Sequence, residues 1–368
     1  MSFEERVYQV ALCMLPGIGP VSAKRLVSHC GTAGEVFRQK KSHLLKIPHI
    51  GQATANALHN KEVMLRAENE LKFAEKKNIR ILFYLDADYP NRLKQCYDSP
   101  AVLFFKGNCS LDQKRIVSIV GTRKITEYGE SLTEKLLQDF AEKNILVVSG
   151  LAYGVDITAH RAALNAGLET IGVLAHGLDL VYPSAHKSTA KKMTEQGGLL
   201  TDFPSGTTPD KENFPMRNRI VAGMCDATIV IESGESGGSM ITAEFATNYN
   251  RDVFAFPGRV GDAASAGCLK LIKTNKAALA ESAADILKAM GWDDEKVQQK
   301  KSQQAALIIP VNPEEEKIVS TLRDHGNVYI DEICSSSGFG MGKVSSLLLT
   351  LEFAGLVKSL PGKFYRLQ

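Results

Sequence analysis

The sequence repeats one local pattern four times: an apolar, strand-like run ends in a short loop rich in glycine and serine, and a helical segment follows. The four runs lie at residues 116–123 (IVSIVGTR), 145–156 (ILVVSGLAYGVD), 170–179 (TIGVLAHGLD) and 227–239 (ATIVIESGESGGS). Strands that alternate with helices form a parallel sheet, and their carboxyl-terminal loops share one edge. Helix N-termini at that edge present unpaired N–H groups to anions. The pattern therefore predicts a doubly wound α/β sheet with a site for several phosphates.

The periodicity of the apolar residues divides the 368-residue chain into parts. Residues 1–78 are helical in pattern, and residues 79–292 contain the strands of an extended Rossmann-like core. A polar stretch rich in lysine and glutamine predicts a linker at 293–312. Residues 313–368 predict three helices and then a hairpin that turns at Pro361–Gly362, an order that resembles a winged helix.

The first part contains two copies of one motif, LPGIGPVSAKRL and IPHIGQATANAL. Glycine in each copy permits a tight turn between two short helices, as in the tandem helix-hairpin-helix module that the segment resembles. Residues 1–78 carry a net charge of +5, whereas residues 79–312 and 313–368 carry −1 each. We expect auxiliary contacts with a DNA backbone here, and the alternative is a helical bundle that only packs on its neighbour. The auxiliary contacts are expected from Gly17, Gly19, Lys24, Arg25 and Gly51.

Composition argues against several classes of protein. Hydrophobic residues make up 44% of the chain and charged residues 23%, which is typical of a globular protein with a sizeable core. Seven cysteines are scattered without C-x-x-C spacing, and the histidines form no H-x-x-x-H pair, so neither disulfides nor a metal site is expected. The N-terminal run MSFEERVYQV does not resemble a signal peptide, and no apolar run is long enough to span a membrane. We expect a cytoplasmic protein that binds no metal and no membrane.

The first two glycine loops carry different chemistry. The loop VGTR lacks the G-x-G-x-x-G spacing of dinucleotide sites, so NAD or FAD is not expected and no cofactor is predicted. Arg123 in this loop is interpreted as a phosphate clamp, with a surface salt bridge as the alternative. The next loop, SGLAYGVDITAH, places Asp156 and His160 on one helical face. We interpret Asp156 as the cap of a helix at 157–166 and as a partner of His160, and an acid/base pair is the alternative.

The segment FPMRNR is the sharpest local signal. Planar rings stack on bases and guanidinium groups fork onto phosphates, so Phe214, Arg217 and Arg219 predict a strand-binding groove. The glycine-rich loop SGESGGSMITAE follows, and it can form a phosphate cradle at a helix start, although it is not a P-loop because no Gly-Lys-Ser/Thr is present. Two glutamates beside this loop are candidate catalytic carboxylates, with structural or capping roles at least as well supported: Glu232 and Glu244.

In chain order, the motifs VGTR, SGLAYGVD-x-x-AH, GLD-x-x-YP, FP-x-RNR, SGGSMITA and AFPGR resemble the DNA-processing protein A family, also called DprA or Smf. The resemblance covers the whole strand-bearing part of the chain. The flanking parts agree with it, because family members often carry a helical N-terminal domain and a winged-helix-like C-terminal domain. Four positions depart from the family pattern: His186, Leu269, Asn275 and Lys276.

The resemblance implies a protein that is not an enzyme. Such a protein binds single-stranded DNA in a basic pocket of its core, forms a homodimer through that core, protects incoming DNA, and delivers the strand to the recombinase RecA in natural transformation and homologous recombination. The resemblance and the loop chemistry together assign DNA contacts to Gly121, Thr122, Arg123, Ser149, Gly150, Gly154, Lys187, Lys211, Phe214, Arg217, Asn218, Arg219, Ser233, Gly237, Gly238 and Ser239.

Two other classes of function stay open. A nucleotide phosphoribohydrolase on a related Rossmann-like fold also uses a glycine-rich loop followed by a glutamate, but the loop SGGSMITAE lacks the Pro-Gly-Gly-x-Gly-Thr pattern of those enzymes. A winged-helix regulator that reads duplex sequence is disfavoured, because the −1 charge of residues 313–368 suits protein contact better than DNA contact.

Overall fold

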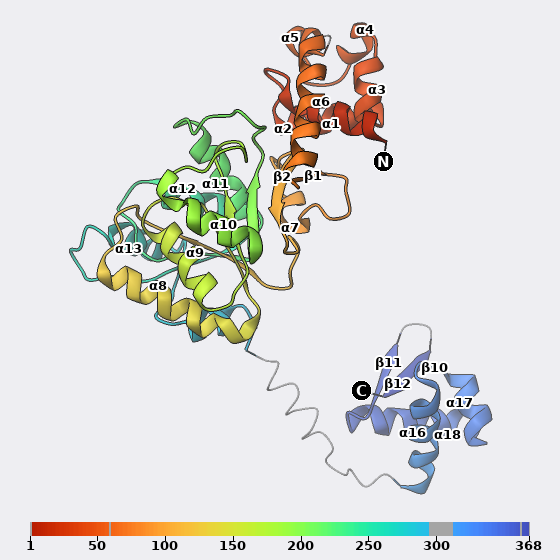
Figure 1. Ribbon diagram of the computed structural model, residues 1–368. Coiled ribbons are helices and arrows are strands. Elements are labelled where there is room, and N and C mark those ends of the chain that lie inside the picture. The colour runs from red at the N-terminus through yellow and green to blue at the C-terminus, as the bar shows by residue number, and fades with distance from the viewer. Residues whose placement is uncertain (1, 59, 294–311, 361–362, 368) are drawn as a thin grey trace. The chain divides into compact units, whose positions relative to one another are not determined.

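The computed structural model describes residues 2–58, 60–293, 312–360 and 363–367 (Figure 1). The chain forms two compact units, which are described separately: Met1–Gly291 and Trp292–Gln368. Two of the sequence-based expectations lie outside the described residues, namely nearly all of the linker and the hairpin turn at Pro361–Gly362.

Six helices form the N-terminal part of the first unit and confirm the expected helical domain. Side chains of Ser2, Thr32 and Asn60 accept N–H bonds and so cap three of these helices. The apolar faces share a core that continues onto the first two strands of the sheet, where it includes Phe83 and Phe104. The helices are α1 (Phe3–Met14), α2 (Pro20–Cys30), α3 (Ala33–Arg38), α4 (Lys41–Leu44), α5 (Gln52–Ala57) and α6 (Lys61–Lys76).

A mostly parallel, nine-stranded sheet follows in the order β1-β2-β6-β5-β4-β3-β7-β8-β9, and it confirms the expected α/β core. β1 and β2 are an addition, because β1 runs antiparallel to β2 and β2 antiparallel to β6. The link between them contains only the short helix α7 (Asn91–Lys94), whereas parallel neighbours are usually joined by a full crossover helix. The strands are β1 (Arg80–Phe83), β2 (Val102–Gly107), β3 (Ile116–Val120), β4 (Leu146–Ser149), β5 (Thr170–Val173), β6 (Gly197–Thr201), β7 (Ala227–Val230), β8 (Asp252–Ala255) and β9 (Ala278–Leu279).

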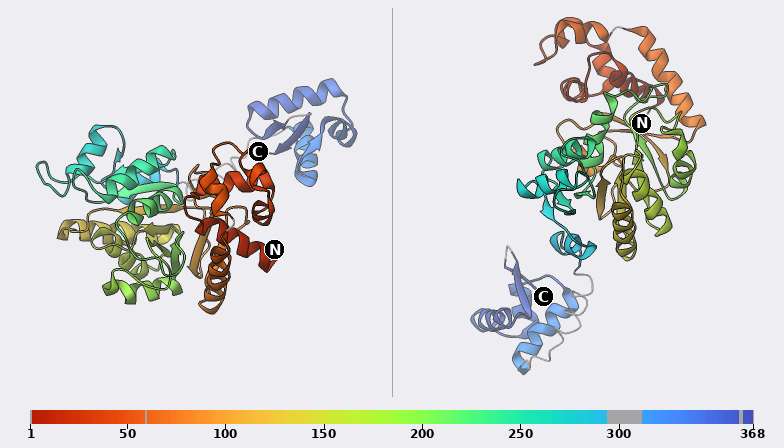
Figure 2. Two further views of the ribbon diagram at one scale, coloured as in Figure 1. Left: turned by 90° about the horizontal axis from the view of Figure 1, so that it is seen from above. Right: turned by 90° about the vertical axis from the view of Figure 1, so that its left-hand side faces the viewer.

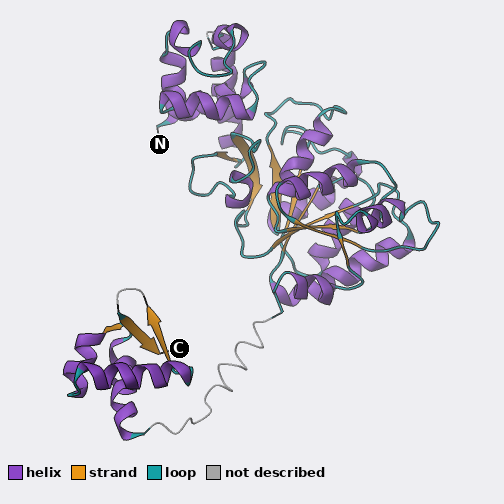
Figure 3. Ribbon diagram, turned by 180° about the vertical axis from the view of Figure 1, so that it is seen from behind, coloured by secondary structure: helices purple, strands orange, loops and turns teal. Residues whose placement is uncertain are grey.

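Helices cover both faces of this sheet (Figure 3). α8 packs on α9, and α11 packs on α12. The N-terminal helices lie beside the edge formed by β1 and β2 in both views of Figure 2, in agreement with the contacts of α6 with β1 and of α1 with β2. The helices of the core are α8 (Glu127–Phe140), η1 (Ala141–Lys143), α9 (Val155–Asn165), η2 (Ser184–His186), α10 (Lys187–Glu195), α11 (Asn213–Gly223), α12 (Gly238–Asn248), α13 (Ala266–Lys273) and α14 (Ala283–Ala289).

The strand order reverses between β3 and β7. β4, β5 and β6 lie on one side of β3, whereas β7, β8 and β9 lie on the other. In a doubly wound sheet, the loops that follow two such strands diverge toward opposite faces and leave a crevice at the carboxyl ends. The crevice is therefore the place where this fold accommodates a ligand.

The second unit has the element order of a winged helix, as expected. Its three strands pair in the order β10-β12-β11. Ile318, Ile333 and Leu348, one from each helix, are buried in its core. The elements are α16 (Pro313–His325), β10 (Val328–Tyr329), α17 (Ile330–Ser337), α18 (Met341–Phe353), β11 (Val357–Leu360) and β12 (Phe364–Leu367). None of the described helices in either unit combines the length and the apolar character needed to cross a membrane.

A buried carboxylate joins α6 to the core of the first unit. Glu70 is 2% exposed, and its two oxygens accept bonds from the backbone N–H of Ser205 at 2.9 Å and from the Ser205 hydroxyl at 2.6 Å. Arg66 donates to the same carboxylate at 2.8 Å and also to the Ser205 carbonyl. The helical domain and the sheet domain are therefore held together by hydrogen bonds to a charge that water does not reach.

Replacing Glu70 with alanine is expected to destabilise this contact by about 2 kcal/mol, because buried hydrogen bonds to a charged group are lost and Arg66 and Ser205 are left without their acceptor. Glu75→Ala is the matched control, since Glu75 lies on the same helix but is exposed and its side chain makes no hydrogen bond among the described residues. Hydrogen exchange of the α6 amides measures the difference. Equal exchange in the two variants would show that the contact contributes nothing.

Candidate nucleic-acid interface

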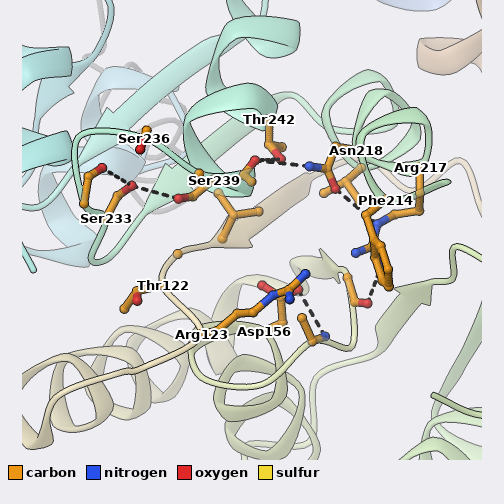
Figure 4. Close-up of a pocket in the computed structure, with 18 residues that line it drawn as sticks. Thr122, Arg123, Asp156, Phe214, Arg217, Asn218, Ser233, Ser236, Ser239 and Thr242 are labelled. Atoms are coloured by element: carbon orange, nitrogen blue, oxygen red, sulfur yellow. Dashed lines mark hydrogen bonds between the residues drawn. The ribbon is translucent and has the colours of Figure 1, made fainter. Parts of the chain in front are cut away.

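A pocket of about 330 Å³ opens at the carboxyl ends of β3, β4 and β7, at the point where the strand order reverses (Figure 4). The loops after these strands and the first turns of α11 form its walls. The structure brings most of the predicted DNA contacts together here: Gly121, Thr122, Arg123, Gly150, Phe214, Arg217, Asn218, Ser233, Gly237, Gly238 and Ser239.

Two glycines allow the loops at and behind the pocket to approach one another closely. A Cβ at Gly150 would lie 2.5 Å from an Asp156 carboxylate oxygen and 2.6 Å from an Arg217 nitrogen. Gly154 has a φ of 75°, and a Cβ there would lie 2.2 Å from the Thr122 carbonyl oxygen. Only glycine lets these loops approach one another and adopt that backbone conformation.

Two helix N-termini at the pocket receive no side-chain cap. α9 begins after Gly154, and α12 begins after Gly237. On the α12 side, Ser233 and Ser239 share a hydroxyl–hydroxyl hydrogen bond of 2.8 Å, and Asn218 donates to the Gly238 carbonyl at 3.1 Å. The first N–H groups of α12 therefore have no partner within the helix, and their positive dipole end favours an anion.

Arg217 is buried at the back of the pocket. It is 5% exposed, and its guanidinium donates to the carbonyls of Gly150 and Val173, at the ends of β4 and β5. Burial raises the pKa of the neighbouring Asp156, and the positive charges of Arg217 and Arg123 partly offset that rise. Since its Nη1 is already engaged by these two carbonyls, Arg217 shapes the site as well as charging it.

Arg123 is the exposed cation of the pocket, and it lies over an aromatic ring. Its guanidinium carbon is 5.4 Å from the centre of the Phe214 ring, and Figure 4 shows both side chains among those that line the pocket. Within the described part of the chain, the Arg123 side chain has no ion pair or hydrogen bond. A guanidinium and a ring in this arrangement present a phosphate partner and a stacking face to the same ligand.

Five predicted contacts lie outside the pocket. Ser149 is buried and donates to the Ile119 carbonyl at 2.6 Å, and Gly154 packs on backbone. Lys187 and Lys211 are exposed, and their side chains have no partner among the described residues. That these four residues contact DNA stays a prediction.

Arg219, the fifth, faces away from the pocket. Its guanidinium pairs with the Asp202 carboxylate at 2.7 Å, donates to the Met216 carbonyl at 3.0 Å, and also donates to the Asp98 carbonyl. The Arg219 and Asp202 side chains are each 9% exposed. The structure therefore does not bring Arg217 and Arg219 to one groove, and DNA contact by Arg219 stays a prediction.

The expected pairing of Asp156 with His160 was wrong. α9 begins at Val155 with Gly154 as its N-cap, so Asp156 lies inside the first turn and accepts a bond from the Ala152 N–H at 3.2 Å. His160 Nδ1 is instead 2.7 Å from the Thr170 hydroxyl. Burial lowers the pKa of His160 to about 3, so this fully buried ring is neutral.

The two candidate catalytic glutamates do not line the pocket. Glu232 is buried and accepts a bond from the Thr126 N–H at 3.0 Å, which places its carboxylate at the start of α8. Glu244 is exposed on α12. Among the described residues, Asp156 is therefore the carboxylate that lines the pocket, and no group of three or more histidine, cysteine, aspartate or glutamate side chains is placed to hold a metal ion.

The predicted auxiliary DNA contacts in the helical domain differ in their exposure and in their partners. Gly17, Gly19 and Gly51 are exposed in the turns, but Lys24 points to the core domain. Lys24 donates to the Ser99 hydroxyl, and burial and the nearby Arg219 lower the pKa of Lys24 to about 8. Arg25 donates to the Pro48 carbonyl at 3.3 Å and links the two hairpins. DNA contacts by these residues stay predictions.

Sequence reasoning missed a second, smaller hollow beside the pocket. It has a volume of about 30 Å³, and two half-exposed tyrosines, Tyr153 and Tyr182, line it together with Phe214 and Arg123. Both tyrosines lie inside motifs that the sequence displays, SGLAYGVD and GLD-x-x-YP. An aromatic residue inside a glycine loop was the signal for them, because such a ring cannot be buried in the sheet.

Three family models match the chain. Residues 80–291 match DNA recombination-mediator protein A. Residues 302–363 match the DprA winged helix domain, and residues 10–61 match a SAM-like helix-hairpin-helix tandem. The first match alone covers more than half of the chain and contains every residue of the pocket.

Individual proteins are similar over long stretches. Protein Smf of Synechocystis sp. is 31% identical over 398 residues, an alignment that covers 100% of both chains. The X-ray structure of DNA processing protein A (DprA) from Streptococcus pneumoniae has a TM-score of 0.62 and 31% identity, and it covers 78% of this chain and 98% of that one. A structure that addresses the single-stranded DNA binding mode of DNA processing protein A from Helicobacter pylori has a TM-score of 0.53 and 28% identity, with 58% and 96% covered.

Arg219→Ala is expected to lower the free energy of unfolding by about 3 kcal/mol, because it leaves the buried Asp202 carboxylate without its partner. Urea denaturation followed by circular dichroism measures this loss. The double variant Arg219→Met/Asp202→Leu, which removes both charges, is expected to lose less than the sum of the two single variants. Additive losses would contradict a buried ion pair at this position.

Proposed function

Since this chain belongs to the DNA recombination-mediator protein A family, together with proteins called DprA and Smf, we propose that it binds single-stranded DNA at the pocket of its core and catalyses no reaction. The observation that carries the proposal is the position of the Arg123 guanidinium over the Phe214 ring in the pocket. A strand that passes this point meets a charge for its phosphate and a ring for its base. The Helicobacter pylori relative, whose structure concerns the binding of single-stranded DNA, supports the same ligand.

The rest of the pocket suits a phosphodiester backbone without a sequence preference. The uncapped start of α12 offers backbone N–H groups to a phosphate, and such donors do not read bases. Ser239 and Ser233 supply hydroxyls next to these groups. Their contacts are to the sugar-phosphate chain, so the protein accepts any strand that exposes its bases.

Beyond strand binding, we propose that the protein forms a homodimer through its core, protects incoming DNA and delivers it to RecA during natural transformation and homologous recombination. Such a handover requires a cytoplasmic protein that holds its strand without modifying it. Family membership supports this role, and the pocket would hold the DNA strand that is passed on.

The absence of catalysis is supported by the separation of Asp156 and His160, the expected acid/base pair. Asp156 accepts a backbone bond and lies beside the buried Arg217, while His160 is bonded elsewhere. A hydrolase needs a carboxylate or an imidazole that can exchange a proton with its substrate. His160 is not available for that exchange, so among the described residues the pocket holds no carboxylate–imidazole pair.

Incubation of the full chain with nucleoside 5′-monophosphates is therefore expected to release no free base above a protein-free blank, as measured by chromatography. The variant Asp156→Asn serves as the control for trace activity. Release of base by the parent protein, and its loss in Asp156→Asn, would favour the phosphoribohydrolase alternative instead.

Two substitutions in the pocket are expected to weaken oligo(dT) binding in different ways, one through the electrostatic contribution and the other through base stacking. Arg123→Ala removes one phosphate contact, so the negative slope of log K against log salt concentration should become shallower by about 0.7. Phe214→Ala removes a stacking face and should cost about 1–3 kcal/mol with the slope unchanged. Fluorescence anisotropy at several salt concentrations measures both quantities.

Arg161→Ala is the matched control for charge, because Arg161 is exposed on α9 and lines a separate hollow with Lys192. It should leave affinity within twofold of the parent. If Arg123→Ala and Phe214→Ala both bind like the parent while remaining folded, the pocket is not the DNA site.

A further inference from the structure

The small hollow beside the pocket brings three aromatic rings to one place. Tyr153 follows β4, Tyr182 follows β5 and Phe214 begins α11, and all three line the hollow together with Arg123. Its volume is about 30 Å³, against about 330 Å³ for the pocket, so the hollow is too small to enclose a nucleobase. The rings therefore act through their outer faces or not at all.

Those outer faces are open to solvent. Tyr153 is 50% exposed and Tyr182 is 49% exposed, and neither hydroxyl has a hydrogen-bond partner among the described residues. Large rings that remain half exposed beside a ligand pocket leave apolar surface in water, and a ligand that covers it is favoured.

Buried histidines contact both tyrosines, Tyr182 through its backbone and Tyr153 through its ring. His176 Nε2 accepts the backbone N–H of Tyr182 at 3.3 Å, while its Nδ1 donates to the Gly177 carbonyl at 2.9 Å. The His186 ring lies 4.9 Å from the Tyr153 ring at an angle of 70°, and its Nδ1 donates to the Leu151 carbonyl at 2.9 Å. The Tyr182 backbone and the Tyr153 ring thus have partners that position them before any ligand arrives.

The rings continue the surface that begins at the pocket opening. The Tyr182 and Phe214 rings are 6.3 Å apart and inclined by 52°, which is too close for a base to insert between them. Each ring offers a separate face, and Arg123 lies over Phe214. An exposed cation with aromatic faces around it is the arrangement that binds single strands by stacking.

We propose that Tyr153 and Tyr182 are two further base-stacking platforms, which extend the strand from Phe214 past Arg123 toward the loops after β4 and β5, and that His186 is the residue that positions Tyr153. This proposal rests on the proposed function. It adds that bases on both sides of the Arg123 phosphate are bound through their faces.

The test compares two strands of equal length and charge: oligo(dT), and the same backbone with every base removed. Tyr153→Ala and Tyr182→Ala are each expected to weaken oligo(dT) binding by about five- to 150-fold, which is the range for one stacked base. Both should bind the abasic strand within twofold of the parent. Tyr153→Phe and Tyr182→Phe keep the ring and should bind oligo(dT) like the parent.

Two further variants complete the comparison. Tyr97→Ala is the control, because Tyr97 is 72% exposed and lines neither the pocket nor the hollow. It should leave both strands unaffected. His186→Asn removes the ring behind Tyr153 and should weaken oligo(dT) but not the abasic strand, whereas His186→Phe should restore binding.

The outcomes separate the two proposals. If oligo(dT) binds the parent and Arg123→Ala weakens it, but both tyrosine-to-alanine variants bind like the parent, the stacking proposal is overturned and the proposed function stands. Equal weakening of both strands by Tyr153→Ala would show an effect through the fold and would also overturn it. If the parent binds neither strand, both proposals fail.

Discussion

The buried guanidinium of Arg217 joins the parts of the pocket. It leaves α11, crosses the ends of β4 and β5, and donates to the carbonyls of Gly150 and Val173 beside the Asp156 carboxylate. A cation that is taken out of water needs such partners, since its desolvation is costly. The carbonyl bonds therefore fix where α11 begins, and with it where Phe214 meets the loops. The exposed surface of the pocket therefore depends on the Arg217 guanidinium, which is buried from solvent.

Much of the fold followed from local chemistry. Apolar runs that alternate with glycine loops and helices predicted the parallel sheet and the loops that meet at its edge, because both depend on periodicity and on backbone conformation. The direction of single side chains did not follow. Arg217 and Arg219 are two positions apart on a helix, which rotates them by about 200°. One therefore faces the pocket, and the other faces Asp202.

The helical domain shows a different reason for a missed orientation. Its +5 charge predicted a DNA-facing surface, yet Lys24 reaches Ser99 of the core domain and lies 5.7 Å from the centre of the Tyr84 ring. Its partner is 75 residues away in the chain, so no local pattern contains it. His160 is a second example, since its partner Thr170 lies on a strand rather than one helical turn away. The sequence indicated the types of residue that form the site, but it did not indicate their tertiary partners.

The two antiparallel strands have a consequence for solubility. β2 covers the edge of β6, and the pair approaches so closely that a Cβ at Gly107 would lie 2.1 Å from the Gly197 carbonyl oxygen. β1 in turn covers β2 and ends the sheet on that side, with Arg80 at its exposed start. An open strand edge is a template for pairing with other chains, and a short, charged terminal strand blocks it. β1 and β2 therefore guard the parallel core against aggregation, in addition to joining it to the helices.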